Sequence, residues 1–273
     1  MKVDFNWLYS QAKDKRTKAF IRKLQTKSSS VDRKDRFALV SLKQNFPLRL
    51  GKYNIWLNKE NSVYSLDIYM ELFRERHHGK MPSFLPKKNN VIIDLGANEG
   101  YSVLKTKEIA PKSKTIAVEP NSTAFRILKK NVEANNLKNV ILVNKAVTSR
   151  NGKISFEVVK GRSEVGAVNV YKKFRRKDRL KKITVSSITL EELCKKYKVD
   201  KIDLLKMDVE GSEVDILKSS KNILPKIKKS IIEYHLAQRT KDRVIKLMVK
   251  NNFKLVKIDD QKYYGDLYFI KSA

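Results

Sequence analysis

From residue 91 to the end of the chain, apolar positions alternate between two spacings. Short runs of β-branched residues, as at 91–93 and 115–118, are typical of strands buried on both faces. Between these runs, apolar residues recur at helical intervals. Short βα steps of this kind predict a doubly wound, mostly parallel seven-stranded α/β sheet covered on both faces. The expected strands are 91–95, 114–119, 139–144, 201–207, 229–234, 253–258 and 264–270, with helices at 99–109, 122–135, 212–219 and 239–251.

The first 80 residues follow another pattern. Apolar residues within 1–27 recur at helical intervals and lysine or arginine fills the other face, which predicts a basic amphipathic helix before a break at 28–30. Prolines at 82 and 86 mark a boundary. We therefore expect a basic helical and β N-terminal extension over 1–80 and a second domain over 81–273. Further expected elements are strands at 37–42, 48–51, 53–57 and 152–158, and helices at 64–76 and 190–197.

A glycine turn follows the strand at 91–95. Gly96 and Gly100 permit positive φ and a close approach of backbone to ligand. Glu119 ends the next strand, where a carboxylate can accept both hydroxyls of a ribose. The full G-x-G-x-x-G of dinucleotide-binding proteins is lacking, so a nucleoside without phosphates, such as S-adenosylmethionine, is favoured. For Asp94 and Glu119, helix N-capping is the structural alternative.

Four pieces of sequence, in this order, resemble the FkbM-type class I methyltransferases. They are DLGANEG at 94–100, VEPN at 118–121, LKMDVEGSE at 205–213 and IEYH at 232–235. The resemblance covers roughly residues 90–240. It implies a class I, Rossmann-like fold and methyl transfer from S-adenosylmethionine, usually to hydroxyls of small molecules and sugars. The implied cofactor-binding residues are Asp94, Gly96, Asn98, Gly100, Tyr101, Glu119, Pro120, Asn121, Ala146 and Val147.

Acids and a histidine follow the next two expected strands. Asp208 and Glu210 come after the fourth strand, and Glu233 and His235 come at the end of the fifth. Ligands of such sheets collect at the carboxyl ends of the strands, so these side chains should face the methyl donor. We expect all four to be catalytic. A carboxylate among them would take the proton of a hydroxyl acceptor or hold an amine.

The three acids within 208–213 could instead bind a divalent cation. No further carboxylate ligand is evident from the sequence, so we expect no metal. Glu213 is better placed to stabilise a helix N-terminus. His77 and His78 have no partner at ligand spacing and are expected to face solvent. Cys194 is expected to be a small core residue.

The net charge of the chain changes which molecule we expect to accept the methyl group. The chain has 60 Lys and Arg against 29 Asp and Glu, a net charge of +31. This excess favours a polyanionic partner, with RNA as the first candidate and an anionic membrane as the second. A bias of the overall composition toward lysine is the alternative explanation. The segment 171–182 interleaves basic residues with Tyr171 and Phe174, as in single-strand binding; a solvated loop is the alternative. The expected substrate-binding residues are Lys172, Lys173, Arg175, Arg176 and Arg179.

We therefore expect methylation of a nucleoside in ribosomal or transfer RNA. O-methylation of a small molecule or glycan is the alternative, and a non-catalytic RNA-binding protein of this fold is a third possibility. One cysteine excludes an internal disulfide. The sequence has no run of 18 apolar residues and no apolar signal core, so we expect a soluble cytoplasmic protein.

Overall fold

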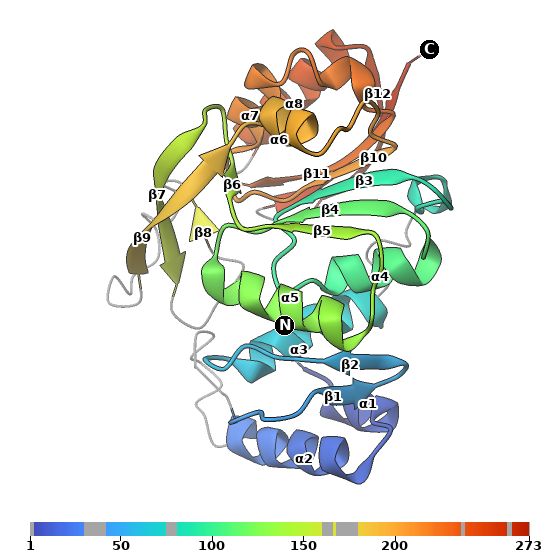
Figure 1. The fold of residues 1–273 in the computed structure, drawn as a ribbon, viewed down its shortest axis with the longest axis vertical. Helices are drawn as coiled ribbons and strands as arrows, with labels where there is room; N and C mark the ends of the chain where they lie inside the picture. The colour runs from blue at the N-terminus through green and yellow to red at the C-terminus, as the bar shows by residue number, and fades with distance from the viewer. Residues whose placement is uncertain are drawn as a thin grey trace.

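The computed structural model describes residues 3–29, 42–74, 81–159, 166–167, 180–235, 238–260 and 264–272. At its centre is a seven-stranded sheet in the order β12-β13-β11-β10-β3-β4-β5 (Figure 1). All neighbours are parallel except β13, which runs antiparallel to β11 and β12. The predicted doubly wound sheet is confirmed. Its strands are β3 (Val91–Leu95), β4 (Lys114–Val118), β5 (Val140–Val143), β10 (Leu204–Met207), β11 (Lys229–His235), β12 (Phe253–Asp260) and β13 (Tyr264–Lys271).

The strand order reverses between β3 and β10. Met207 of β10 pairs with Leu95 of β3, so the carboxyl ends of these two strands lie side by side. Two groups of helices cover opposite faces of the sheet (Figure 1). One group is α4 (Tyr101–Ile109) and α5 (Ser122–Ala134); the other is α6 (Leu190–Lys196), α7 (Glu213–Ser219) and α8 (Gln238–Lys250). Short 3-10 helices occur at η2 (Pro82–Phe84) and η4 (Leu224–Lys226).

A second, four-stranded sheet has the order β6-β9-β7-β8. Its strands are β6 (Ala146–Val147), β7 (Gly152–Val159), β8 (Gly166–Ala167) and β9 (Leu180–Ile188). The strand predicted at 152–158 is confirmed as β7. The pattern did not predict β9, which begins within the basic segment. None of the helices within the described ranges is long and apolar enough to cross a membrane.

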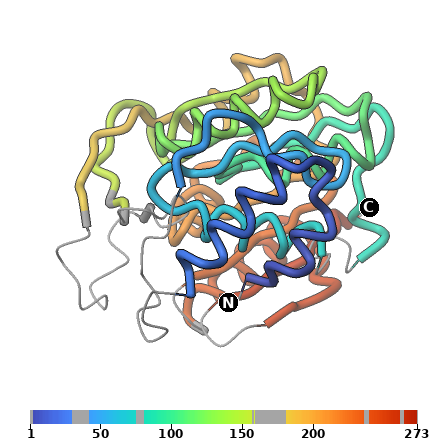
Figure 2. Tube along the Cα trace, turned by 90° about the horizontal axis from the view of Figure 1, so that it is seen from below, coloured from blue at the N-terminus to red at the C-terminus, as the bar shows by residue number. Residues whose placement is uncertain are grey.

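The N-terminal elements form a layer under α4 and α5, and Figure 2 shows α1 and α2 in dark blue nearest the viewer. The prediction of one helix over 1–27 is wrong, because the chain breaks between α1 and α2. Lys13 N donates to Arg49 O at 2.9 Å, and Asp14 caps the second helix by accepting from Thr17 N at 2.8 Å. The elements are α1 (Phe5–Gln11), α2 (Lys15–Ser29), β1 (Leu48–Leu50), β2 (Tyr53–Ile55) and α3 (Ser62–Phe73).

Asn131 of α5 and Asn135, which follows the end of this helix, hydrogen-bond the backbone at and just beyond β2. Asn54 N donates to Asn135 Oδ1 at 2.8 Å, and Trp56 N donates to Asn131 Oδ1 at 2.7 Å. The Asn131 amide also donates to Trp56 O at 3.2 Å and to Glu99 O at 2.9 Å. These side chains form hydrogen bonds with backbone groups that would otherwise be unpaired at the open edge of the strand. They also connect the N-terminal layer to the residue before Gly100.

The core of the N-terminal layer continues into α4. Tyr101 and Leu104 of α4 belong to the same buried cluster as Leu50 and Tyr69. Because the two parts share this core, the predicted domain boundary at residue 80 stays a prediction. The strand expected at 37–42 lies outside the described residues except for its last position.

Replacing Asn131 with alanine is expected to lower the free energy of unfolding by about 1–3 kcal/mol, because the partly buried amide of Trp56 loses its acceptor. Thermal or urea unfolding measures this change. Lys129 is exposed on the same helix, so Lys129→Ala serves as the control and should change stability by less than about 0.5 kcal/mol. Equal effects of the two substitutions would contradict the proposed role of Asn131.

Candidate active site

Both glycines of the turn after β3 are required by the packing of the chain itself. Gly96 has φ +85°, and a Cβ there would lie 1.8 Å from Asp208 O. Gly100 has φ +88°, and a Cβ there would lie 2.5 Å from Leu128 Cδ1. The expected close approach at Gly96 is therefore an approach to the end of β10. It brings the turn directly beside the acids that follow that strand.

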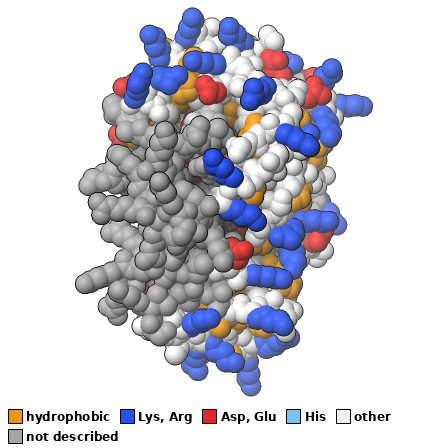
Figure 3. All heavy atoms as spheres, turned by 90° about the vertical axis from the view of Figure 1, so that its left-hand side faces the viewer, with side chains coloured by type: hydrophobic (Ala, Val, Ile, Leu, Met, Phe, Trp, Pro, Cys, Tyr) orange, Lys and Arg blue, Asp and Glu red, His pale blue; other side chains and the backbone are white. Residues whose placement is uncertain are grey.

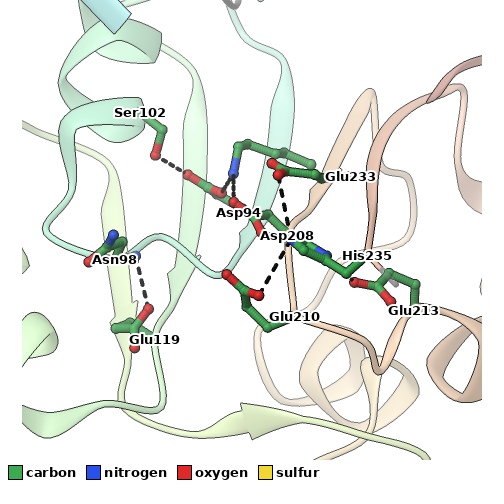
Figure 4. A network of polar contacts seen from close by, with 10 residues as sticks. Asp94, Asn98, Ser102, Glu119, Asp208, Glu210, Glu213, Glu233 and His235 are labelled. Atoms are coloured by element: carbon green, nitrogen blue, oxygen red, sulfur yellow. Dashed lines mark hydrogen bonds and ion pairs between the residues drawn. The ribbon is translucent and has the colours of Figure 1, made fainter. Parts of the chain in front are cut away.

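Glu119 braces the turn from the end of β4. Its Oε2 accepts from Asn98 N at 2.9 Å and its Oε1 accepts from Asn121 N at 2.7 Å (Figure 4). Burial raises the pKa of Glu119 to about 8, although the two amide hydrogen bonds favour the ionised form. Each carboxylate oxygen has further lone pairs, so these bonds leave acceptor capacity for a ligand.

A cavity opens between the turn, the end of β4 and the small sheet. Its empty volume is about 610 Å³, including the part open to solvent. Six of the residues expected to bind the cofactor line it: Gly96, Asn98, Glu119, Pro120, Ala146 and Val147. Asn98 Oδ1 is buried and has no hydrogen-bond donor among the described residues. A ligand with a free N–H or O–H would supply that donor.

The cavity also has lining residues that the sequence analysis missed. Ile154 and Phe156 of β7 line it from the small sheet, and Val209 lines it from the end of β10, between the predicted residues Asp208 and Glu210. Apolar residues at alternate positions of a strand share one face, and this spacing was the available signal for Ile154 and Phe156. Lys145, Thr148 and Ser212 are further lining residues that were not predicted.

Two residues expected to bind the cofactor point their side chains elsewhere. The Tyr101 hydroxyl donates to Glu99 Oε2 at 2.9 Å and to Trp56 O at 3.3 Å, within the core shared with the N-terminal layer. Asn121 caps α5 by accepting from Thr123 N at 3.0 Å. The cavity is lined by none of the four residues Asp94, Gly100, Tyr101 and Asn121.

Asp94 lies beside the cavity in a buried ion pair. It accepts from Ser102 Oγ at 2.5 Å, and Lys206 Nζ lies 3.5 Å from Asp94 Oδ1 (Figure 4). The same ammonium lies 3.5 Å from Asp208 Oδ2. Burial alone would lower the pKa of Lys206, but Asp94 and Asp208 raise it above its usual value. Lys206 is therefore a fixed cation between the ends of β3 and β10.

His235 lies at the centre of four carboxylates (Figure 4). Its Nδ1 is 3.0 Å from Glu213 Oε1, and its Nε2 is 3.4 Å from Glu233 Oε1, 3.5 Å from Glu210 Oε2 and 3.8 Å from Asp208 Oδ1. Burial alone would lower the pKa of His235, but these carboxylates raise it well above its usual value. The side chain is thus an imidazolium that holds the acids together, and it has no free lone pair for general base catalysis.

Glu233 is an acid of this cluster with a raised pKa. Burial, with the nearby charge of Asp208, raises its pKa to about 8. Its side chain keeps a relative exposure of 25%, so an acceptor can reach it. Glu213 is fully buried and accepts from Gly211 N at 2.9 Å, at the start of α7. The expected placement of Glu213 at a helix N-terminus is confirmed.

The sequence showed no further carboxylate that could complete a metal site with the acids at 208–213. The structure brings Glu233 into this position. Ligand atoms of Asp208, Glu233 and His235 lie within 4.8 Å of one another and could hold a metal ion. Metal binding would require the imidazolium to lose its proton. The absence of a metal stays a prediction. Cys194 is buried, and burial raises the pKa of its thiol to about 11.

The residues expected to bind the substrate lie outside the described part of the chain. These are Lys172, Lys173, Arg175, Arg176 and Arg179, and the same holds for His77 and His78. On the face shown in Figure 3, lysine and arginine side chains are scattered over the described surface with a few acids among them. Positive charge on that face is therefore not confined to one patch.

Comparison with known proteins identifies a family match. The profile of the methyltransferase FkbM domain matches residues 94–255. The 2-O-methyltransferase NoeI of Sinorhizobium fredii is 28% identical over 206 residues, covering 68% of this chain and 82% of that protein. The hexuronic acid methyltransferase AglP of Haloferax volcanii is 30% identical over 162 residues, covering 59% and 62%. A tRNA(Phe) (4-demethylwyosine(37)-C(7)) aminocarboxypropyltransferase of Methanocaldococcus jannaschii is 26% identical over 127 residues, covering 45% and 49%.

Proposed function

Because the chain belongs to the FkbM methyltransferase family, and is a methyltransferase that uses S-adenosylmethionine, we propose that it methylates a hydroxyl group of a carbohydrate. The observation that carries this proposal is the carboxylate cluster at the ends of β10 and β11. Within it, Glu233 has a pKa of about 8, close to the operating pH at which general bases work best. A hydroxyl needs such a base to become a nucleophile.

The residues around the cavity fit the cofactor. Glu119 would accept hydrogen bonds from the ribose hydroxyls, and Asn98 Oδ1 would accept from a donor of the same ligand. Val147, Ile154 and Phe156 would pack against the adenine ring. When bound, S-adenosylmethionine supplies a methyl group on a positively charged sulfur.

Glu233 would take the proton of the acceptor hydroxyl as the oxygen becomes nucleophilic. Asp208 Oδ2 lies 3.5 Å from the Lys206 ammonium, and this carboxylate would accept a hydrogen bond from a neighbouring hydroxyl and orient the acceptor. The His235 imidazolium keeps Glu210 and Glu233 in place through its Nε2. Positioning supplies much of the acceleration in such reactions, and these fixed charges provide it.

Two observations favour a carbohydrate over RNA. The acids next to the cavity, Asp208 and Glu210, would repel phosphate groups. Sugar hydroxyls, in contrast, donate well to carboxylates. The relatives NoeI and AglP are named as a 2-O-methyltransferase and a hexuronic acid methyltransferase, which also supports a hydroxyl-bearing sugar as acceptor.

Methylation of an RNA nucleoside is the second candidate, and net charge is the observation that favours it. The chain carries +31, and α2 contains basic side chains but no Asp or Glu. Phosphate contacts from such residues would position a nucleic acid without reading its sequence. A ribose 2′-hydroxyl would then meet the same carboxylates.

The acceptor class can be tested with the protein and a methyl-labelled donor. Incubation with separate glycan and RNA fractions of a cell extract should place the label in the glycan fraction. Nuclease treatment of the extract should leave that signal unchanged. Label that appears only in RNA would overturn the carbohydrate proposal in favour of the second candidate.

The rate of methyl transfer should depend on the ionisation of Glu233. We expect kcat to rise about tenfold per pH unit below about pH 8 and then level off, because the protonated carboxyl cannot accept the acceptor's proton. The measurement is kcat at saturating cofactor and acceptor across this range. A profile that is flat through pH 8 would contradict the assignment of Glu233 as the base.

A further inference from the structure

A second cavity lies at the beginning of β7, where it meets the end of β9 and helix α6. Its empty volume is about 860 Å³, including the part open to solvent. We call it the lysine pocket, after three of the residues that line it. The lining includes Lys145, Lys153, Lys196, Asn151, Ser186 and Glu192.

Within the described ranges, no ion pair neutralises the positive charge of the lysine pocket. Lys145, Lys153 and Lys196 pair with no carboxylate there, and Glu192 is the one acid among the described lining residues. Elsewhere in the same ranges, Lys206 and Lys241 each lie against a carboxylate. Like charges that share a pocket repel each other, and a bound anion relieves this repulsion.

The frame of the lysine pocket is fixed by strand pairing. Ala146 of β6 and Gly152 of β7 both pair with Ser187 of β9, and Lys153 pairs with Ser186. Lys145 precedes β6 and lines both the lysine pocket and the cofactor cavity. An anion bound here would therefore lie next to the methyl donor's cavity, held by side chains on a paired framework.

The lining chemistry indicates the class of anion. Lysine ammonium groups bind oxyanions as point charges, and the Ser186 hydroxyl and Asn151 amide add hydrogen-bonding groups. Glu192 would accept from sugar hydroxyls but would repel the closely spaced phosphates of a nucleic acid. On the basis of the carbohydrate function proposed above, we propose that the lysine pocket binds the carboxylate of an acidic sugar within the acceptor glycan.

The two sites imply an acceptor longer than one sugar. Lys145 follows β5 and Asp208 follows β10, and β3 and β4 lie between these strands. Three strand spacings amount to about 14 Å. An occupant that reaches both the carboxylate cluster and the lysine pocket must span this width, so the acceptor is an oligosaccharide or polysaccharide.

The test uses binding, which is independent of methyl transfer. A tetramer of galacturonic acid is titrated into the full chain saturated with S-adenosylhomocysteine, and calorimetry gives Kd. The double variant Lys153→Ser/Lys196→Ser should weaken binding about tenfold or more and reduce its dependence on salt. The control variant Lys250→Ser/Lys254→Ser removes the same charge from exposed positions outside the pocket and should change Kd less than about twofold.

Four outcomes would overturn the lysine pocket as a carboxylate site. They are no binding of the galacturonate tetramer to the wild-type chain, equal weakening in both double variants, equal binding of neutral maltotetraose, and tighter binding of an oligouridylate tetramer that the pocket variant abolishes. The last result would assign the pocket to a nucleic acid. Labelling of glycan fractions by the wild-type chain tests the carbohydrate function separately, so either proposal can fail without the other.

Discussion

Replacement of Glu233 by glutamine is expected to lower kcat by about 100-fold or more, with little change in cofactor affinity. General base catalysis contributes about 10²–10⁴-fold, and the amide of glutamine cannot accept the proton. Glu233 does not line the cofactor cavity, so the binding of S-adenosylmethionine should persist. The measurements are kcat for the acceptor and calorimetric titration of the cofactor.

Asp215→Asn is a matched control for this experiment. Asp215 is an exposed acid of the first turn of α7, near the cluster in sequence but outside the contacts of His235. Its replacement should leave kcat within about twofold. A Glu233→Gln enzyme that kept more than a tenth of the wild-type kcat would transfer the base role to another acid, with Asp208 the next candidate. Loss of cofactor binding in the same variant would contradict the separation of the two sites.

Replacement of Glu119 by alanine is expected to weaken cofactor binding by about 100-fold. A hydrogen bond contributes about 0.5–1.5 kcal/mol, and the Glu119 side chain would accept from two ribose hydroxyls. The substitution should also lower stability, because the amides of Asn98 and Asn121 lose their acceptor. Cofactor Kd and the melting temperature of the free protein are both measured.

Asn144→Ala separates the two effects of Glu119→Ala. The Asn144 side chain donates to Glu119 O at 2.7 Å, so it supports the same backbone without touching the carboxylate. This variant should melt at a lower temperature while its Kd for S-adenosylmethionine changes by less than about threefold. If both variants bound the cofactor equally well, the ribose assignment of Glu119 would be wrong.

The centre of the sheet could be predicted from sequence because β3 and β4 are short runs rich in β-branched residues, each followed by a turn and a helix. Val91–Leu95 and Lys114–Val118 have the predicted limits to within one residue. β9 was not predicted because it mixes lysines, serines and threonines with apolar residues. Its formation depends on pairing with β7, a contact between distant segments that local pattern cannot reveal.

The position of the candidate site could be predicted from the sequence, but the protonation state of His235 could not. The carboxyl ends of parallel strands gather at one edge, so the sequence placed Asp208 and His235 together. Two details came only from the folded chain. Glu210 has φ 54°, and this left-handed backbone goes with a carboxylate placed beside His235 Nε2. Glu213 reaches Nδ1 from a helix. Together they make the histidine a cation rather than a base.

The hydrogen bonds of Asn131 have a practical consequence for anyone who shortens this chain. A fragment starting at residue 81 would lose Trp56, the partner of both Asn131 and the Tyr101 hydroxyl. The apolar side chains of Tyr101 and Leu104, which are buried against the N-terminal layer, would be exposed to solvent. Glu99 accepts hydrogen bonds from the side chains of Tyr101 and Asn131, and it lies one residue before Gly100. Removal of the N-terminal layer would thus loosen the glycine turn after β3, and such a fragment would be a poor substitute for the intact enzyme in binding assays.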